Sequence, residues 1–212
     1  DCLVTVDYPG FNMKLAKLAH EKGIPVVSYI APSAWAWHKS RAKNVAKIVD
    51  KVASIFPFEY DVYKEAGANV EFVGHPLVDI VKPKMTEAEA NTFAGKQDDR
   101  KLILIMPGSR LMEIEKMLPT LLEAAKLIKK QLPEVDFVMP RAGSIPLQML
   151  EEKIKASGIS VKITEGNNYD LFSVADLALA TSGTVTLEAA LCGLGSVIVY
   201  RTNPLTYFIA KL

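Results

Sequence analysis

Short runs of apolar residues alternate with longer stretches of helical periodicity along almost the whole chain. In the first 82 residues this pattern predicts four strands separated by three helices. The expected strands are residues 3–6, 25–30, 52–56 and 70–73. Because these strands are almost wholly apolar rather than alternating apolar and polar, they are typical of a parallel sheet that helices cover on both faces.

The alternation pauses over residues 83–100, which carry many charges and predict one weak helix near 87–94. It then predicts a second set of strands, at 102–106, 135–140, 161–163, 177–180 and 196–200. The sequence therefore predicts an α/β protein with two Rossmann-like lobes, 1–82 and 101–212, joined by the connection 83–100. Since the pattern starts and stops abruptly, we expect an internal fragment in which both lobes are incomplete.

Composition narrows the class of protein. Of the 212 residues, 50% are hydrophobic and 23% charged, which excludes a mainly disordered chain. A net charge of +1 argues against a nucleic-acid binder that relies on bulk charge. Cys2 and Cys192 lie far apart, so we expect neither a disulfide framework nor a structural zinc site. The longest charge-free stretch, residues 23–37, is too short and too rich in Pro and Ser to span a bilayer.

The loop after the first strand of the second lobe reads Met-Pro-Gly-Ser-Arg. In parallel α/β sheets, ligands bind at the carboxyl ends of strands, where this loop lies. Gly108 permits a tight turn, Ser109 offers a hydroxyl, and Arg110 offers a fork of N–H donors to a phosphate. An ordinary strand-to-helix turn with an exposed Arg accounts for the same residues equally well.

A second loop of the same lobe reads Ala-Thr-Ser-Gly-Thr-Val-Thr-Leu-Glu. Its Ser182, Gly183 and Thr184 would set hydroxyls and backbone N–H groups at a helix N-terminus, which suits a diphosphate. Glu188, one turn later, can accept hydrogen bonds from a ribose. The alternative is that Thr181 or Ser182 simply caps the helix. Two anion-friendly loops facing one crevice favour a nucleotide-sugar site over two independent caps.

The first lobe carries polar side chains at its strand ends as well. Asp7 follows the first strand, where a carboxylate facing an interlobe cleft can act as a general base. By pattern alone, helix capping by Asp7 or Asn12 is the more common role. His75 stands between a Gly and a Pro at another strand end, where a hydrogen-bonded structural histidine is the usual finding.

One loop combines aromatic and basic residues. It holds Ser33 and both tryptophans of the chain, Trp35 and Trp37. Four cations follow in the next stretch: Lys39, Arg41, Lys43 and Lys47. Aromatic rings beside cations are typical of contact with a sugar, a lipid phosphate or a membrane surface. A helix with a buried Trp and a solvated basic face explains the pattern equally well.

Six motifs, taken in order, give the chain a family resemblance: Val-Asp-Tyr-Pro-Gly-Phe-Asn, Ala-Pro-Ser-Ala-Trp-Ala-Trp, Phe-Pro-Phe-Glu, Phe-Val-Gly-His-Pro-Leu, Met-Pro-Gly-Ser-Arg and Ser-Gly-Thr-Val-Thr-Leu-Glu. In these the chain resembles the lipid-A-disaccharide synthase family. The resemblance implies a two-lobed glycosyltransferase of the GT-B type that needs no catalytic metal or cofactor. Such an enzyme transfers diacylglucosamine from UDP to diacylglucosamine 1-phosphate, forming a β-1,6 bond, on the cytoplasmic side of a Gram-negative inner membrane.

The resemblance also implies roles for single residues. Asp7 corresponds to the general base and Arg110 to an essential arginine at the UDP diphosphate. The remaining expected UDP-binding residues are Gly108, Ser109, Ser182, Gly183, Thr184 and Glu188. The residues expected on the acceptor or membrane side are Asn12, Ser33, Trp35, Trp37 and His75. The rivals are another UDP-N-acetylglucosamine enzyme of this architecture, such as a lipid-acceptor transferase or 2-epimerase, and a noncatalytic binding module. The expected partners are the two lipid-linked sugars and the membrane, with no nucleic acid, and a homodimer is allowed.

Overall fold

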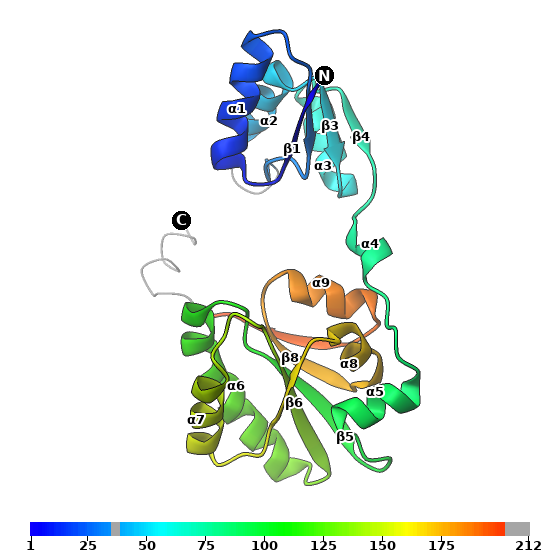
Figure 1. The fold of residues 1–212 in the computed structure, drawn as a ribbon, viewed down its shortest axis with the longest axis vertical. Coiled ribbons are helices and arrows are strands. Elements are labelled where there is room, and N and C mark those ends of the chain that lie inside the picture. Colours follow the sequence, from blue (N-terminus) through cyan, green and yellow to red (C-terminus); the bar gives the residue numbers. More distant parts are fainter. Residues whose placement is uncertain (35–38, 202–212) are drawn as a thin grey trace. The chain divides into compact units, whose positions relative to one another are not determined.

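The computed structural model describes residues 1–34 and 39–201. It divides into two compact units, Asp1–Ile80 (the first unit) and Val81–Leu212 (the second unit) (Figure 1). Each unit is built around its own parallel sheet. The predicted fold class, two α/β lobes with parallel sheets, is therefore confirmed. Among the described residues, no helix combines the length and the apolar character needed to cross a bilayer.

The first unit has a four-stranded sheet in the simple order β1-β2-β3-β4 (Figure 1). Its elements are β1 (Leu3–Val6), α1 (Pro9–Glu21), β2 (Val26–Tyr29), α2 (Lys39–Ile48), β3 (Lys51–Ser54), α3 (Pro57–Glu65), β4 (Val70–Phe72) and α4 (Leu77–Ile80). Ala16 on α1, Val45 on α2 and Tyr63 on α3 pack with the sheet residues Val26 and Val52 in one core. The strands are short and parallel, so their carboxyl ends and the loops that follow lie along one edge of the sheet.

The second unit has a five-stranded parallel sheet in the order β7-β6-β5-β8-β9. Its elements are α5 (Glu87–Ala94), β5 (Lys101–Met106), α6 (Leu111–Gln131), β6 (Val135–Arg141), α7 (Leu147–Ser157), β7 (Lys162–Glu165), α8 (Asn168–Val174), β8 (Leu177–Thr181), α9 (Thr184–Leu191) and β9 (Ser196–Val199). From β5 the chain runs outward through β6 and β7, then returns to the other side of β5 as β8. This reversal creates a topological switch point between β5 and β8.

Successive residues of β5 enter two different cores, which explains why the strand is apolar throughout. Ile103 and Ile105 pack with α6 and α7, whereas Leu102, Leu104 and Met106 pack with α5, α8 and α9. Side chains of a strand alternate between the two faces of its sheet, so helices cover both faces (Figure 1). The uninterrupted apolar strands predicted a parallel sheet covered by helices on both faces, and the packing of β5 agrees with that prediction.

The segment 83–100, expected to connect the two lobes, packs as part of the second unit. The predicted helix is α5, Glu87–Ala94, and the two alanines it buries lie in the same core as α8. The buried carboxylate of Asp170 on α8 accepts the backbone N–H groups of Lys84 at 2.6 Å and Met85 at 2.7 Å. Glu87 and Glu89 of α5 are exposed while Ala90 and Ala94 are buried, so charge content alone misrepresents the environment of this helix.

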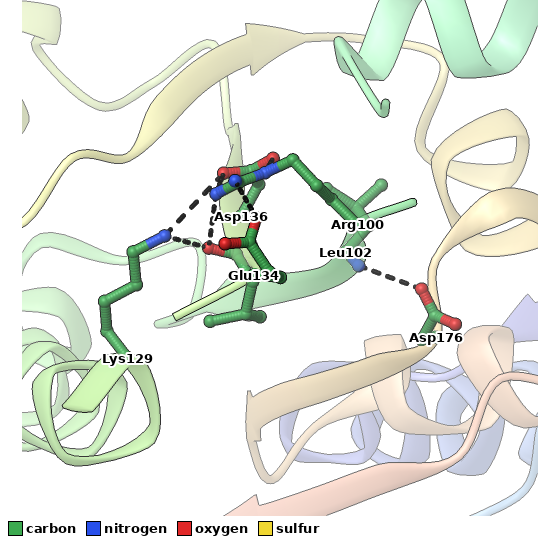
Figure 2. A network of polar contacts seen from close by, with 7 residues as sticks. Arg100, Leu102, Lys129, Glu134, Asp136 and Asp176 are labelled. Carbon is green, nitrogen blue, oxygen red and sulfur yellow. Dashed lines mark hydrogen bonds and ion pairs between the residues drawn. The ribbon is translucent and has the colours of Figure 1, made fainter. Parts of the chain in front are cut away.

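Charged side chains at the amino-terminal ends of β5 and β6 form an ion-pair network (Figure 2). The guanidinium of Arg100 donates from Nε and Nη2 to the two carboxylate oxygens of Asp136, at 2.5 and 2.7 Å. Its Nη1 donates to Glu134 at 2.6 Å, and the ammonium of Lys129 lies 4.0 Å from Asp136. Bidentate pairs of this kind restrict geometry, so the network ties β5 to β6 at the edge opposite the strand ends that bind ligands.

A third carboxylate at this edge, Asp176, lies just before β8 (Figure 2). It accepts the backbone N–H of Leu102 at 2.9 Å, and the ammonium groups of Lys101 and Lys96 lie 3.0 and 3.1 Å away. Burial acts to raise the pKa of Asp176, but these donors outweigh burial and lower the pKa to about 2. The charged carboxylate therefore stabilises the junction of β5 and β8.

We expect Asp176→Asn to remove one acid-sensitive contribution to stability. A carboxylate with a pKa of about 2 when folded and about 4 when unfolded stabilises the fold above pH 4. This stabilisation, about 2 kcal/mol, is lost as the pH falls from about 4 toward 2. The difference in free energy of unfolding between wild type and variant, measured by urea denaturation, should shrink by that amount across this window.

Glu151→Gln, at an exposed position on α7, is the control and should give no such step. A pH-independent difference for Asp176→Asn would contradict the assignment.

Candidate functional site

The two loops singled out in the sequence lie next to each other in the second unit. β5 and β8 are paired parallel strands, with Met106 opposite Ala180, so the loops that follow them start side by side. Together they line a pocket of about 480 Å³ at the switch point between these strands, called here the switch-point pocket. Open α/β sheets bind ligands at this position, and small-molecule sites span about 300–1,000 Å³. The lining includes all the predicted UDP-side residues: Gly108, Ser109, Arg110, Ser182, Gly183, Thr184 and Glu188.

The loop after β5 has a conformation that only glycine fits at position 108. The backbone φ of Gly108 is +111°, in the region that L side chains rarely adopt. A Cβ atom there would lie 2.7 Å from Oε2 of Glu113. The same Glu113 carboxylate accepts the backbone N–H of Ser109 at 3.3 Å and Nη1 of Arg110 at 3.0 Å. Glu113 therefore fixes both the turn and the arginine that it presents.

Glu113 also lines the pocket, and the sequence analysis did not predict it. The signal was present, because Glu113 is the third residue of α6 after Arg110, the position from which a Glu side chain reaches back to the first turn. The Arg110 side chain remains 80% exposed. A guanidinium has five donors, and the hydrogen bond to Glu113 uses one of them. The others face solvent at the pocket, where an anion can accept them.

The loop after β8 leads into α9 through Gly183, the N-cap residue. In the described part of the chain, no side chain caps the N-terminus of α9, so capping by Thr181 or Ser182 is not what the structure has. The hydroxyl of Thr186 instead donates to the Gly183 carbonyl at 2.7 Å. The first N–H groups of α9 are therefore open at the pocket wall, and an uncapped helix N-terminus carries partial positive charge.

Three polar side chains, Thr181, Glu188 and Asn168, line other parts of the switch-point pocket. Thr181 is buried, and its hydroxyl has no hydrogen-bond partner among the described residues. Burial raises the pKa of Glu188, and a hydrogen bond from the hydroxyl of Tyr169 opposes that rise only in part. Glu188 is half-buried and lines the pocket, where it can accept hydrogen bonds from the hydroxyls of a sugar. Asn168 at the start of α8 completes this side.

Asp7, in the first unit, stands at the carboxyl end of β1 on an unusual stretch of backbone. Asp7 and Tyr8 have φ values of 48° and 43°, in the left-handed region. The side-chain amide of Asn12 donates to the carbonyls of Val6 at 3.1 Å and Asp7 at 2.8 Å and so holds this turn. No side chain of the described residues caps α1, and Asp7 is exposed, so the capping role is absent. Left-handed non-glycine residues cluster at functional sites, which keeps Asp7 a candidate.

The other first-unit candidates are placed as follows. Ser33 is exposed, on a loop that the buried Tyr63 hydroxyl fixes by donating to the Pro32 carbonyl at 2.6 Å. Nδ1 of His75 accepts the backbone N–H of Leu77 at 3.1 Å, and its ring lies 5.0 Å from that of Phe56. His75 thus has the hydrogen-bonded, structural arrangement weighed as the alternative. The predictions for Trp35 and Trp37 lie outside the described residues. Within the described ranges, no group of three His, Cys, Asp or Glu side chains is arranged to hold a metal ion.

The fold and the switch-point pocket define the class first: a two-lobed α/β protein of the GT-B type. Solved structures with this fold include a UDP-GlcNAc 2-epimerase from Neisseria meningitidis bound to UDP-GlcNAc, with a TM-score of 0.67 and 18% identity over 99% of this chain and 62% of that one. They also include the pneumococcal O-GlcNAc transferase GtfA in complex with UDP and GlcNAc, with a TM-score of 0.53 and 14% identity over 97% of this chain and 43% of that one. At these identities the likeness shows the fold.

Sequence comparison then gives the family. The model of the lipid-A-disaccharide synthetase family matches residues 1–212, so the chain belongs to that family. A lipid-A-disaccharide synthase from Geobacter sulfurreducens is 42% identical over 100% of this chain and 55% of its own length. One from Coxiella burnetii is 37% identical over the same shares. The resemblance seen in the six motifs is confirmed, and the chain spans about half the length of the curated relatives it matches.

Proposed function

We propose that the protein carrying this chain condenses UDP-2,3-diacylglucosamine with 2,3-diacylglucosamine 1-phosphate. The products are the β-1,6-linked lipid A disaccharide 1-phosphate and UDP. The observation that carries the proposal is the convergence of the two loops on one pocket at the switch point of the second unit. Membership of the family supports the particular substrates.

In the proposed site, the switch-point pocket holds the UDP part of the donor. Arg110 and the open N–H groups of α9 bind the diphosphate, with the Ser182 and Thr184 hydroxyls beside them. Glu188 accepts hydrogen bonds from the ribose. Charge grows on the diphosphate as it leaves, and donors fixed before the reaction stabilise that charge most effectively. The hydrogen bonds from Ser109 and Arg110 to Glu113 supply this rigidity.

On the acceptor side, Asp7 is the proposed general base. The acceptor 6-hydroxyl oxygen attacks C1 of the donor sugar, the C1–O bond to the diphosphate breaks, and the hydroxyl proton passes to the Asp7 carboxylate. Attack on the face opposite the leaving group inverts the anomeric centre, which gives the β-linkage. Asn12, by holding the Val6 and Asp7 carbonyls, positions the carboxylate for this step.

The proposal includes a place of action, the cytoplasmic face of the inner membrane. The curated relatives of this chain come from Gram-negative genera such as Geobacter, Nitrosococcus and Coxiella. Trp35, Trp37 and the cations that follow them are the proposed contact with the membrane. Co-sedimentation of the full-length protein with anionic but not neutral vesicles is the expected result, and equal recovery with both would contradict this contact.

The test of the reaction is transfer of labelled diacylglucosamine from its UDP carrier by the full-length protein that carries this sequence. A labelled disaccharide 1-phosphate, formed together with UDP, supports the proposal. Conversion of the UDP-sugar to its 2-epimer without any acceptor would identify an epimerase instead. Calorimetric binding of UDP without transfer would identify a binding module. Either of these outcomes overturns the proposed function.

A further inference from the structure

A second cavity lies in the first unit, between α1 and α2, and is called here the α1–α2 cavity. Its volume is about 310 Å³, at the lower end of the range of about 300–1,000 Å³ for small-molecule sites. Most of its wall is apolar and is formed by side chains that include Met13, Pro32, Val45 and Ile48. Val45 and Pro32 are buried, so the floor of the cavity belongs to the core of the unit.

Among the described residues that line the α1–α2 cavity, the polar side chains come from one helix. Arg41 and Asn44, both exposed and both on α2, are the polar side chains of its lining. The α2 sequence, Lys-Ser-Arg-Ala-Lys-Asn-Val-Ala-Lys-Ile, has four cations and no acidic residue. Among the described residues, Arg41 has no ion-pair partner. The cavity thus combines an apolar interior with a cationic margin, which suits an apolar chain attached to an anionic group.

The position of the α1–α2 cavity relates it to the proposed reaction. Pro9 and Gly10 form part of its wall and follow Asp7 by two and three residues. Asn12, which holds the Asp7 turn, belongs to the same helix. A molecule seated in this cavity is therefore bound by the helix that starts two residues after the proposed general base.

We propose that the α1–α2 cavity binds the 2-linked acyl chain of the acceptor, with Arg41 binding the acceptor's 1-phosphate. The proposal rests on the proposed function and names a subsite for it. The phosphate on C1 and the acyl group on C2 are attached to neighbouring ring carbons. One cation beside one apolar cavity can therefore bind both at once. Asn44 supplies a hydrogen-bond donor for the acyl carbonyl.

The first experiment fills the cavity in the full-length protein. A Cβ atom at Gly10 meets nothing within 4 Å, so Gly10→Leu is the first filling variant, and Met13→Trp is a second, independent one. With wild type, the KM for the acceptor should fall roughly three- to fourfold for each methylene added to the 2-linked chain, until the cavity is full. Both variants should raise the KM for long-chain acceptors at least tenfold. They should leave the KM for an acetylated acceptor and for the donor unchanged. Thermal unfolding of each variant verifies that it folds.

The second experiment tests whether Arg41 itself binds the phosphate or whether any positive charge on this unit has the same effect. Arg41→Gln should raise the KM for the phosphorylated acceptor about tenfold and abolish the preference for that acceptor over one without phosphate. Lys14→Gln removes the same charge from an exposed site on α1 that does not line the cavity, and should leave both values unchanged. An Arg41→Gln variant that keeps the preference for phosphate would overturn this part of the proposal.

The outcomes distinguish this inference from the proposed function. If wild type forms the disaccharide and both filling variants keep the wild-type KM for long-chain acceptors, the cavity assignment fails while the function stands. If wild type forms no disaccharide, the proposed function fails, and a dansyl-labelled dodecanoic acid then probes the cavity directly. Its fluorescence should rise with wild type and not with Gly10→Leu. Variants that lose binding to phosphatidylglycerol vesicles, yet keep the acceptor KM, would assign the cavity to a membrane lipid and overturn the acceptor assignment.

Discussion

Arg110→Ala is expected to lower kcat of the full-length protein by about 10²–10³-fold, the usual effect of removing one preorganised donor from a developing anion. Arg110 belongs to the turn after β5, and this turn lines the same pocket as the start of α9, where the donor diphosphate is proposed to bind. Its side chain is 80% exposed, so its loss leaves the fold intact. The defect should therefore appear in turnover and UDP affinity rather than in thermal stability.

Two matched variants sharpen this prediction. Arg110→Lys keeps the charge but loses the fork geometry, so we expect it to retain only part of the activity. Lys116→Ala is the control, at an exposed position on α6, the helix that follows Arg110. Lys116 does not line the switch-point pocket, so this variant should have wild-type kinetics. Steady-state rates of disaccharide formation and calorimetric titration with UDP are the measurements. Near-normal turnover of Arg110→Ala would remove this residue from the site.

Asp7→Asn is the second substitution with a large expected effect. A general base contributes about 10²–10⁴-fold to a rate, so kcat should fall by that factor. Asparagine has the same shape and tolerates the left-handed backbone found at this position, so the turn held by Asn12 should persist. Because the residues proposed to bind UDP all belong to the second unit, affinity for UDP should not change. A split between lost turnover and unchanged UDP binding is the expected signature.

Asp61→Asn is the control for this experiment, because it removes an exposed carboxylate from α3 of the same unit. It should leave kcat unchanged. If Asp7→Asn turns over at the wild-type rate, Asp7 serves only the conformation of the loop after β1. The same assay on Asn12→Ala then reports whether that conformation itself matters.

The fold was predictable because burial on both faces leaves a direct trace in a parallel strand. Ile103 and Leu104 enter different cores, so no polar residue interrupts β5. The pairing of the two pocket loops followed from a general rule about strand ends. By contrast, α5 looked like part of a connection because the segment 83–100 around it is rich in charged residues and α5 itself buries only two small residues. Neither its packing nor the bonds that Asp170 makes to Lys84 and Met85 have a local sequence signal.

The candidate site, like the fold, has features that the sequence predicted and features that it did not. Residue types and their spacing predicted the pocket-lining residues that are proposed to bind UDP. They did not predict Glu113, because a glutamate in the first turn of a helix is common and is no sign of a binding site. The capping alternatives for Asp7 and Ser182 could not be weighed from sequence, since a cap depends on which side chain actually reaches the helix N-terminus. The apolar α1–α2 cavity depends on the packing of two helices and has no motif of its own.

The close approach of Gly108 to Glu113 has a consequence for how this family can vary. Any other residue at 108 brings a carbon to within 2.7 Å of the carboxylate, and a smaller residue at 113 would relieve that clash but not the +111° backbone angle. The two positions are thus energetically coupled, and the effects of changing them should not add. A combinatorial library that randomises both sites should return active clones with the glycine–glutamate pair far more often than independent sampling of the two codons would give.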